Sequence, residues 1–129
     1  MDRAQLADWV ERYERAWRAP GTEALAELFT DDATYSTAPY AEPHRGLDAI
    51  RKMWEAERSP GEEFSMDSEI VATDGDLGVV RLVVEYRKPR SQQYRDLWVI
   101  RLDGDGRCTE FEEWPFWPPG SGGGAADGA

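Results

Sequence analysis

Residues 93–114, QYRDLWVIRLDGDGRCTEFEEW, predict two antiparallel strands joined by a tight turn. Apolar and polar residues alternate on both sides of DGDG, and repeated Asp-Gly pairs are typical of hairpin turns. A symmetric turn places Trp98 opposite Phe111, on the more apolar face, which we expect to point inward. That face also carries Tyr94, Ile100 and Leu102, and the outward face carries Arg95, Leu97, Val99, Arg101, Cys108, Glu110, Glu112 and Trp114.

Two carboxylates share the inward face of this hairpin. A symmetric turn sets Asp96 directly opposite Glu113, and a slip of two residues would make them diagonal neighbours on the same face. Like charges that are close together and half-buried raise at least one pKa, which suits a general acid or base near neutral pH. The alternative is that the pair lies at an open rim, solvated or paired with an arginine such as Arg45.

Upstream of this hairpin, the pattern predicts three helices. Residues 3–19 repeat apolar side chains at helical spacing, and a second, shorter helix is expected after Thr22, whose hydroxyl would cap it. A short strand is expected at 33–36 and a loop over 38–46, where prolines recur. The third helix is expected over 47–58.

Beyond the third helix, the apolar period changes from helical to two. Residues 64–70 alternate, and residues 77–87, LGVVRLVVEYR, predict another long strand after a turn at 74–76. Three helices and a short strand, followed by four long antiparallel strands, are typical of an α+β domain. One face of the sheet must then be covered by the helices.

Length and charge narrow the class of protein. The chain has 129 residues, which indicates one domain, and we expect it to span residues 1–117. Its formal net charge is -11, which disfavours binding to nucleic acid or to an anionic membrane. Residues 118–129, PPGSGGGAADGA, contain too few apolar side chains to pack and are expected to be a disordered tail.

Cysteine content and the amino-terminal stretch indicate a cytoplasmic protein. Cys108 is the single cysteine, so it cannot form an internal disulfide or build a zinc site alone. No apolar run approaches a membrane span, and residues 1–17 are acidic and amphipathic, unlike a signal peptide. A cytoplasmic location is therefore the expectation.

Four segments together resemble a known superfamily. They are WVERYERAW (9–17), LAELFTDDATYS (25–36), EPHRGLDAIRKMWEAE (42–57) and LWVIRLDGDGRCTEFEEW (97–114). The chain resembles the nuclear transport factor 2-like superfamily, in its SnoaL-like and ketosteroid-isomerase-like branch, over about residues 3–117. The resemblance implies a cone in which three amino-terminal helices pack on a curved, mostly antiparallel sheet and enclose a pocket. It also implies dimers that form through the outer sheet face.

The resemblance carries over only in part to individual residues. Tyr13 matches the helical tyrosine that donates to an oxyanion in ketosteroid isomerases, but Thr37 and Trp98 stand where those enzymes carry carboxylates. Epoxide hydrolases similar to limonene-epoxide hydrolase have an Arg-x-Asp pair that matches Asp96 and Trp98, and a further aspartate that matches Glu113. Of these positions only Glu113 keeps its carboxylate. Neither of the two mechanisms is therefore implied intact.

The candidate site combines the inward carboxylates with aromatic and hydroxyl side chains. Asp96, Glu113 and Tyr13 are the candidate catalytic residues. Ligand contacts are expected from Trp17, Tyr35, Thr37, Tyr40, His44, Trp54, Tyr86, Trp98 and Phe111. No metal site is expected, because a single histidine among scattered acids is a poor ligand set. No cofactor is expected either, because the chain lacks a glycine-rich phosphate loop and a dinucleotide fingerprint.

Three functions remain open at this point. The first is cofactor-independent acid/base chemistry, as isomerase, cyclase or dehydratase, on a small apolar or aromatic molecule. The second is a pocket that binds such a molecule without catalysis. The third is a dimeric interaction module that uses Leu97, Val99 and Trp114 on the outward face, and it is compatible with either of the others.

Overall fold

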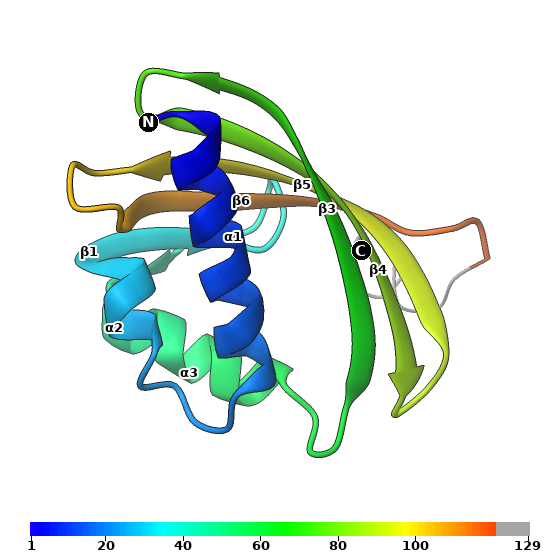
Figure 1. Cartoon of the computed structure of the whole chain (residues 1–129). Coiled ribbons are helices and arrows are strands. Elements are labelled where there is room, and N and C mark those ends of the chain that lie inside the picture. Colours follow the sequence, from blue (N-terminus) through cyan, green and yellow to red (C-terminus); the bar gives the residue numbers. More distant parts are fainter. Residues whose placement is uncertain (121–129) are drawn as a thin grey trace.

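The computed structural model describes residues 1–120 and has three helices and one six-stranded sheet, in strand order β2-β1-β6-β5-β4-β3 (Figure 1). The helices are α1 (Arg3–Arg18), α2 (Leu25–Leu28) and α3 (Leu47–Glu57). The strands are β1 (Phe29–Ser36), β2 (His44–Arg45), β3 (Glu63–Asp74), β4 (Leu77–Lys88), β5 (Gln92–Leu102) and β6 (Cys108–Phe116). The predicted α+β class is confirmed, and the sheet is antiparallel except between β1 and β6.

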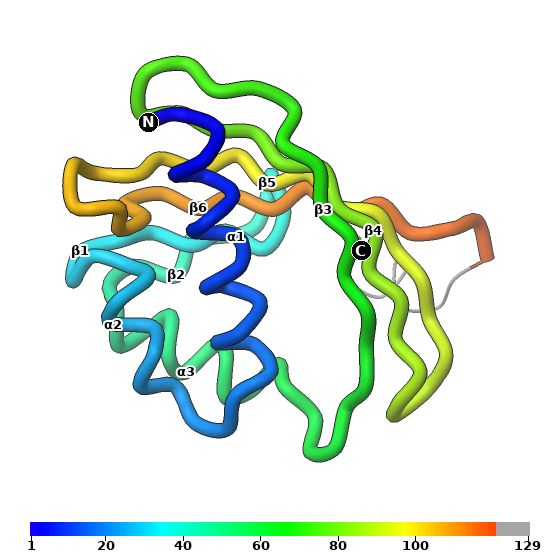
Figure 2. Tube along the Cα trace, viewed as in Figure 1, coloured from blue at the N-terminus to red at the C-terminus, as the bar shows by residue number. Residues whose placement is uncertain are grey.

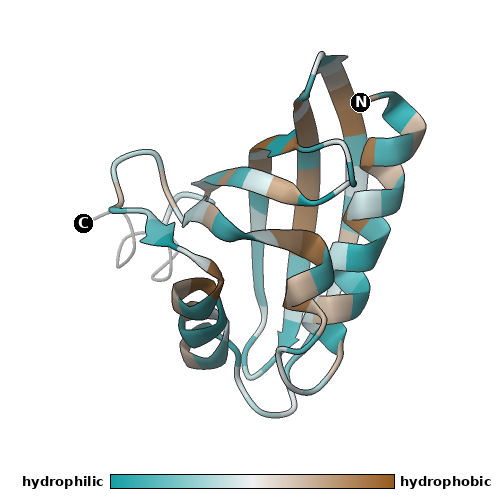
Figure 3. Cartoon of the chain, turned by 90° about the vertical axis from the view of Figure 1, so that its left-hand side faces the viewer, coloured by the Kyte–Doolittle hydropathy of each residue, from teal (hydrophilic) through white to brown (hydrophobic). Residues whose placement is uncertain are grey.

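The sheet curves around α1, and α2 and α3 close one side of the cone (Figure 2). Helix α1 begins with a capping box, in which Asp2 accepts from the Gln5 N–H and Gln5 accepts from the Asp2 N–H, both at 2.8 Å. Its buried face carries Leu6, Trp9, Val10, Tyr13 and Ala16. Hydrophobic and hydrophilic residues alternate along the strands, as Figure 3 shows, so one face of the sheet packs on the helices.

Two local expectations upstream of the sheet were wrong. Thr22 does not cap α2, because the cap position is Ala24 without a side-chain bond, and the Thr22 hydroxyl reaches Glu55 instead at 3.5 Å. The predicted loop contains β2, in which His44 pairs with Tyr35. The Gly46 N–H donates to the Ala33 carbonyl at 2.7 Å, and its φ of 90° favours glycine at the start of α3.

The β5–β6 register differs from the symmetric hairpin. Trp98 lies opposite Glu113 and Asp96 lies opposite Pro115, which is the two-residue slip. One residue of the slip comes from the turn, where the Asp103 N–H donates to the Arg107 carbonyl at 2.8 Å. The second comes from a register shift between Arg101 and Leu102, which leaves an extra residue in β6.

The register shift explains why the prediction for Cys108 was wrong. A one-residue offset reverses the facing of a strand, so Cys108, opposite Leu102, is fully buried instead of pointing outward. The extra residue then restores the expected parity from Glu110 onward, and Phe111 and Glu113 stay on the inward side. No helix within residues 1–120 has the length and apolar character needed to cross a membrane.

Candidate functional site

A cavity of about 630 Å³ lies between α1, α3, the loop after β1 and the strands β3–β6. Elements far apart in the chain converge on it, because the sheet curves around the helices (Figure 1). Nine of the residues that the sequence singled out line this cavity: Tyr13, Trp17, Tyr35, Thr37, Tyr40, Tyr86, Asp96, Trp98 and Glu113. Tyr40 is fully exposed and lies at the edge of the cavity.

The structure places the other three of those residues outside the cavity wall. Trp54 is fully buried behind Trp17, with ring centroids 4.8 Å apart. Phe111 stacks on Tyr35, with centroids 4.3 Å apart, and so supports the wall from behind. His44 lies in edge strand β2, half-buried and opposite Tyr35 in register.

Other lining residues had been placed on the sheet without being assigned to the site. Tyr94, on the inward face of β5, lines the cavity, as do Phe64 and Met66 of β3. The period-two pattern of these strands was the signal that could have found them. Glu57, at the exposed end of α3, and Trp117, which follows β6, also line the cavity. The sequence around these two residues has no periodic pattern that could have assigned them to it.

Asp96 is the one buried acidic side chain in the described residues, with 2% of its surface exposed. Its Oδ2 accepts a hydrogen bond from the Trp98 indole N–H at 3.0 Å, while its buried Oδ1 has no donor within residues 1–120. Asp96 is therefore neither at a solvated rim nor paired with Arg45, which is exposed and forms no ion pair in this part of the chain. Oδ1 therefore lacks the hydrogen-bond donor that a buried oxygen normally has.

Glu113 is the second carboxyl group in the cavity wall. Its Oε1 accepts a hydrogen bond from the Tyr35 hydroxyl at 3.3 Å. Burial raises the pKa of Glu113 well above its ordinary value of 4.5, and the negative charge of Asp96 raises it further. Burial also raises the pKa of Asp96, although the proximity of Glu113 and the hydrogen bond from Trp98 oppose that rise. When the pair carries a single proton, that proton therefore lies on Glu113.

A short hydrogen-bonded chain of tyrosines leads from α1 to Glu113. The Tyr13 and Tyr35 hydroxyl oxygens are 2.7 Å apart, and Tyr35 donates to Glu113. Burial and the charge of Glu113 raise the pKa of Tyr13 and of Tyr35 well above 10.0, so both phenols stay protonated in the physiological range. The chain can donate hydrogen bonds to a carboxylate or to a ligand oxygen, but it cannot serve as a base.

The arrangement can give and accept protons in an apolar setting. Glu113 keeps its proton to a higher pH than an ordinary carboxyl group, Asp96 lies in the same wall, and aromatic rings surround both. Within the described residues, no group of three or more His, Cys, Asp or Glu side chains is arranged to hold a metal ion. Proton transfer is the chemistry that these side chains support.

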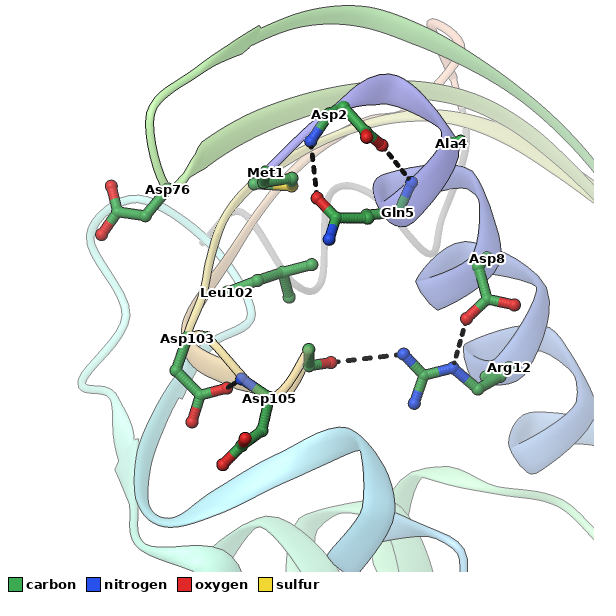
Figure 4. Close-up of a pocket in the computed structure, with 12 residues that line it drawn as sticks. Met1, Asp2, Ala4, Gln5, Asp8, Arg12, Asp76, Leu102, Asp103 and Asp105 are labelled. Carbon is green, nitrogen blue, oxygen red and sulfur yellow. Dashed lines mark hydrogen bonds and ion pairs between the residues drawn. The ribbon is translucent and has the colours of Figure 1, made fainter.

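A second cavity of about 630 Å³ lies at the other end of α1, beside the β5–β6 turn (Figure 4). Most of its acidic side chains are engaged in structural contacts. Asp8 pairs with Arg12 at 2.9 Å, and Arg12 also donates to the Gly106 carbonyl at 3.2 Å. Asp2 caps α1, and Asp103 accepts two backbone N–H groups of the turn. Asp105, at the exposed turn, is the one lining acid whose side chain makes no hydrogen bond or ion pair with the described residues.

Comparison with solved structures shows the same fold in many proteins. An NTF2-like protein of unknown function from Mesorhizobium loti shares 23% identity, with a TM-score of 0.67 over 89% of this chain and 94% of that chain. An LEH-like epoxide hydrolase from M. tuberculosis shares 16% identity, with a TM-score of 0.65 over 87% and 83%. SalBIII, an epoxide hydrolase/cyclase-like enzyme in pyran ring formation in the polyether salinomycin, shares 16% identity, with a TM-score of 0.67 over 90% and 92%.

Identities this low establish the fold and leave the activity open. Comparison with curated protein sequences found no match. The family model for the SnoaL-like domain matches residues 10–111, which include α1 from Val10 onward, the strands β3, β4 and β5, and the first part of β6 up to Phe111. The expected superfamily and its cone-shaped fold are thereby confirmed, and the chain belongs to the SnoaL-like domain family.

Proposed function

We propose that the cavity binds a small apolar or aromatic molecule and that Glu113 and Asp96 carry out proton transfer on it without a cofactor. The observation that carries this proposal is the pair of interacting carboxyl groups in the wall of an aromatic cavity. An isomerisation, a cyclisation or a dehydration each needs one proton added and one removed. A site with one protonated and one ionised carboxyl group supplies both functions.

The environment of each carboxyl group suggests its role. Glu113, whose pKa is raised further, donates a proton to a substrate oxygen, and the Asp96 carboxylate, which lines the same cavity, removes a proton from a substrate carbon. After one turnover the pair still contains one proton, now on Asp96, and it passes back to Glu113 within the interacting pair. The Tyr13–Tyr35 chain holds Glu113 in place and donates hydrogen bonds.

A matched set of variants tests this proposal. Ligands would first be found by thermal shift, since a molecule that binds only the folded chain raises its melting temperature. Each ligand would then be incubated in D₂O with wild type, Glu113→Gln, Asp96→Asn and Glu112→Gln, and analysed by mass spectrometry. Glu112 lies next to Glu113 on the opposite strand face and serves as the control.

We expect deuterium uptake or product formation with wild type and Glu112→Gln, and at least a 100-fold loss in the other two variants, as is typical of removing a general acid or base. Uptake that persists in both carboxyl variants would contradict the roles given to them. Binding without exchange or product would favour the second candidate, a non-catalytic pocket. Thr37 and Trp98, which replace the carboxylates of related isomerases, are the observation that favours it.

A further inference from the structure

The charged groups that line the cavity are all acidic. Asp96 and Glu113 lie in its wall and Glu57 lies at its exposed edge, and no Lys, Arg or His lines it within residues 1–120. The nearby arginines are engaged elsewhere: Arg18 bonds the Phe64 carbonyl at 3.0 Å and pairs with Glu14 at 2.8 Å. Arg58 bonds the Ala19 carbonyl at 2.7 Å. The carboxyl groups therefore have no neutralising partner from the described part of the chain.

Aromatic rings make up much of the remaining wall. Tyr13, Trp17, Tyr35, Tyr86, Tyr94 and Trp98 all line the cavity. The faces of aromatic rings are electron-rich and attract a cation within about 6 Å of the ring centroid, most strongly where water is excluded. Rings and carboxylates together form a wall of negative potential, and a formal net charge of -11 adds a long-range attraction for cations.

Asp96 supplies an independent sign of a missing ligand. Its side chain is 2% exposed, it lines the cavity, and its Oδ1 lacks a hydrogen-bond donor in the described residues. A neutral apolar ligand would displace water from the cavity wall around Asp96 and leave its carboxylate without a compensating charge. A ligand with a positively charged nitrogen would face Asp96 and the rings with favourable electrostatic contacts instead.

We infer that the cavity selects an organic cation, namely a protonated or quaternary amine attached to an apolar or aromatic body. The inference rests on the proposed function only because it concerns the same cavity. It narrows the ligand from any small apolar or aromatic molecule to one that carries a positive charge. Anionic molecules are disfavoured because Asp96 and Glu57 repel them, and neutral ones of equal size bind more weakly because they leave the carboxyl groups uncompensated.

Cation binding is coupled to the proton that the carboxyl pair shares. A positive charge beside the pair favours its ionised form, so the ligand expels the proton from Glu113. The titratable groups that face the pair are Tyr13 from α1, Tyr35 from β1, Glu57 from α3, Tyr86 from β4 and Tyr94 from β5. The tyrosines stay neutral, so Glu113 dominates the coupling, and affinity for a cation of fixed charge rises with pH.

Two probes of the same shape test the inference. Benzyltrimethylammonium carries a permanent charge, and neopentylbenzene is its neutral counterpart, with carbon in place of nitrogen. Binding to the full chain would be measured by tryptophan fluorescence, since Trp17 and Trp98 line the cavity, at pH 6 and pH 8. We expect the cation to bind at least 10-fold more tightly than the neutral probe at pH 8, with a smaller ratio at pH 6.

Charge-neutral variants locate the effect. Asp96→Asn and Glu113→Gln should each reduce the preference for the cation at least threefold, while Glu112→Gln on the outer side should keep it. Glu57→Gln, at the exposed edge, provides a further test if a buried variant fails to fold. Calorimetric titrations at pH 6 in two buffers of different ionisation enthalpy should show proton release on binding of the cation.

The outcomes separate this inference from the proposed function. Equal or tighter binding of neopentylbenzene overturns the inference but leaves proton transfer on neutral substrates intact, as the D₂O exchange measurement would show. A cation preference that survives in all three carboxyl variants also overturns it, because the charge would then be recognised elsewhere. If neither probe binds at millimolar concentration, the inference is wrong, and exchange with other ligands decides the proposed function separately.

Discussion

Glu113 lies directly opposite Trp98 in the β5–β6 ladder, and the Trp98 indole in turn donates to Asp96 on its own strand. The two carboxyl groups are therefore diagonal neighbours across the hairpin. Diagonal positions in a sheet are roughly 7–8 Å apart at the backbone, within reach of a long side chain. This spacing lets the pair share one proton without forcing two charges into direct opposition, which explains why an acidic pair can remain on an apolar face.

The first prediction concerns stability as a function of pH. The pKa of Glu113 is raised in the folded chain above its value of 4.5, so its contribution to stability is complete below pH 4.5 and is lost as the pH rises through the folded pKa. Glu113→Gln cannot ionise, so its advantage over wild type should grow as the pH rises above 4.5 and should reach about 1.4 kcal/mol for each unit of raised pKa once the pH exceeds the folded pKa. Urea unfolding at pH 4, 6 and 8 measures this.

The control for that measurement is Glu112→Gln, whose side chain lies on the outer face beside Trp114. Its stability should follow wild type at all three pH values. A Glu113→Gln chain that parallels wild type between pH 4 and pH 8 would show that Glu113 ionises as it does in the unfolded state, and the shared proton would be ruled out.

The second prediction separates the charge of Asp96 from its hydrogen bond. Asparagine at this position keeps an oxygen that can accept from the Trp98 indole, whereas alanine leaves that buried N–H without a partner. Asp96→Ala should therefore be less stable than Asp96→Asn by about 1–3 kcal/mol, the cost of a buried unsatisfied donor. Repeating the pair in a Trp98→Phe background should shrink the difference, and an unchanged difference would assign it to packing alone.

The third prediction concerns the tyrosine chain. The Tyr35 hydroxyl donates to Glu113 and thereby holds the pKa of Glu113 lower than burial alone would place it. Tyr35→Phe should raise the pKa of Glu113, while Tyr13→Phe removes a hydroxyl that bonds only Tyr35 and should have a smaller effect. The ¹³C shift of the Glu113 carboxyl carbon, followed by NMR against pH, reports both values. A fall in the pKa in Tyr35→Phe would contradict the assignment of donor and acceptor.

The fourth prediction tests the shifted hairpin register through its cysteine. Cys108 is fully buried opposite Leu102, and burial raises the pKa of its thiol. A disulfide reagent such as Ellman's reagent should leave the native chain unmodified and should modify one thiol per chain after denaturation in urea. Rapid modification of the native chain would instead match the symmetric turn, in which this side chain points outward.

The sequence pattern predicted the fold well because the two faces of each strand differ strongly in polarity. The alternation in β5 and β6 placed Asp96 and Glu113 inward whichever register applied, since a two-residue slip preserves parity. The local error at Cys108 arose because the turn and the extra residue each shift the ladder by one. Neither shift alters the alternation of polar and apolar residues in the sequence, so neither can be predicted from it. The backbone hydrogen bond at Asp103 shows the first of them.

The sequence predicted which residues point to the inner side of the sheet, but not which of them reach the surface of the cavity. Phe111 and Trp98 share the inward face, yet Trp98 lines the cavity whereas Phe111 lies behind Tyr35. Depth depends on how far the sheet bends and on which ring packs on which, and these are tertiary properties. Glu57 illustrates the same limit, because its position at the cavity edge follows from the placement of α3, and its sequence context resembles that of any exposed helical residue.

The fifth prediction concerns self-association through the outer sheet face. Leu97 and Trp114 are register partners there, and Trp114 is 40% exposed, a large apolar side chain for a solvent-facing position. Arginines and glutamates of β5 and β6 surround them, so two copies related by a twofold axis would match charges around an apolar centre. We propose a homodimer with this face at its centre.

Trp114→Glu should weaken this homodimer by about 2 kcal/mol, roughly 30-fold in Kd, as for an interface hot spot. Light scattering coupled to size-exclusion chromatography over a dilution series measures this, with Tyr40→Glu, an exposed aromatic at the cavity edge, as the matched control. A wild-type chain that elutes as a monomer at every concentration would rule out the dimer, and equal dissociation of both variants would move the interface away from this face.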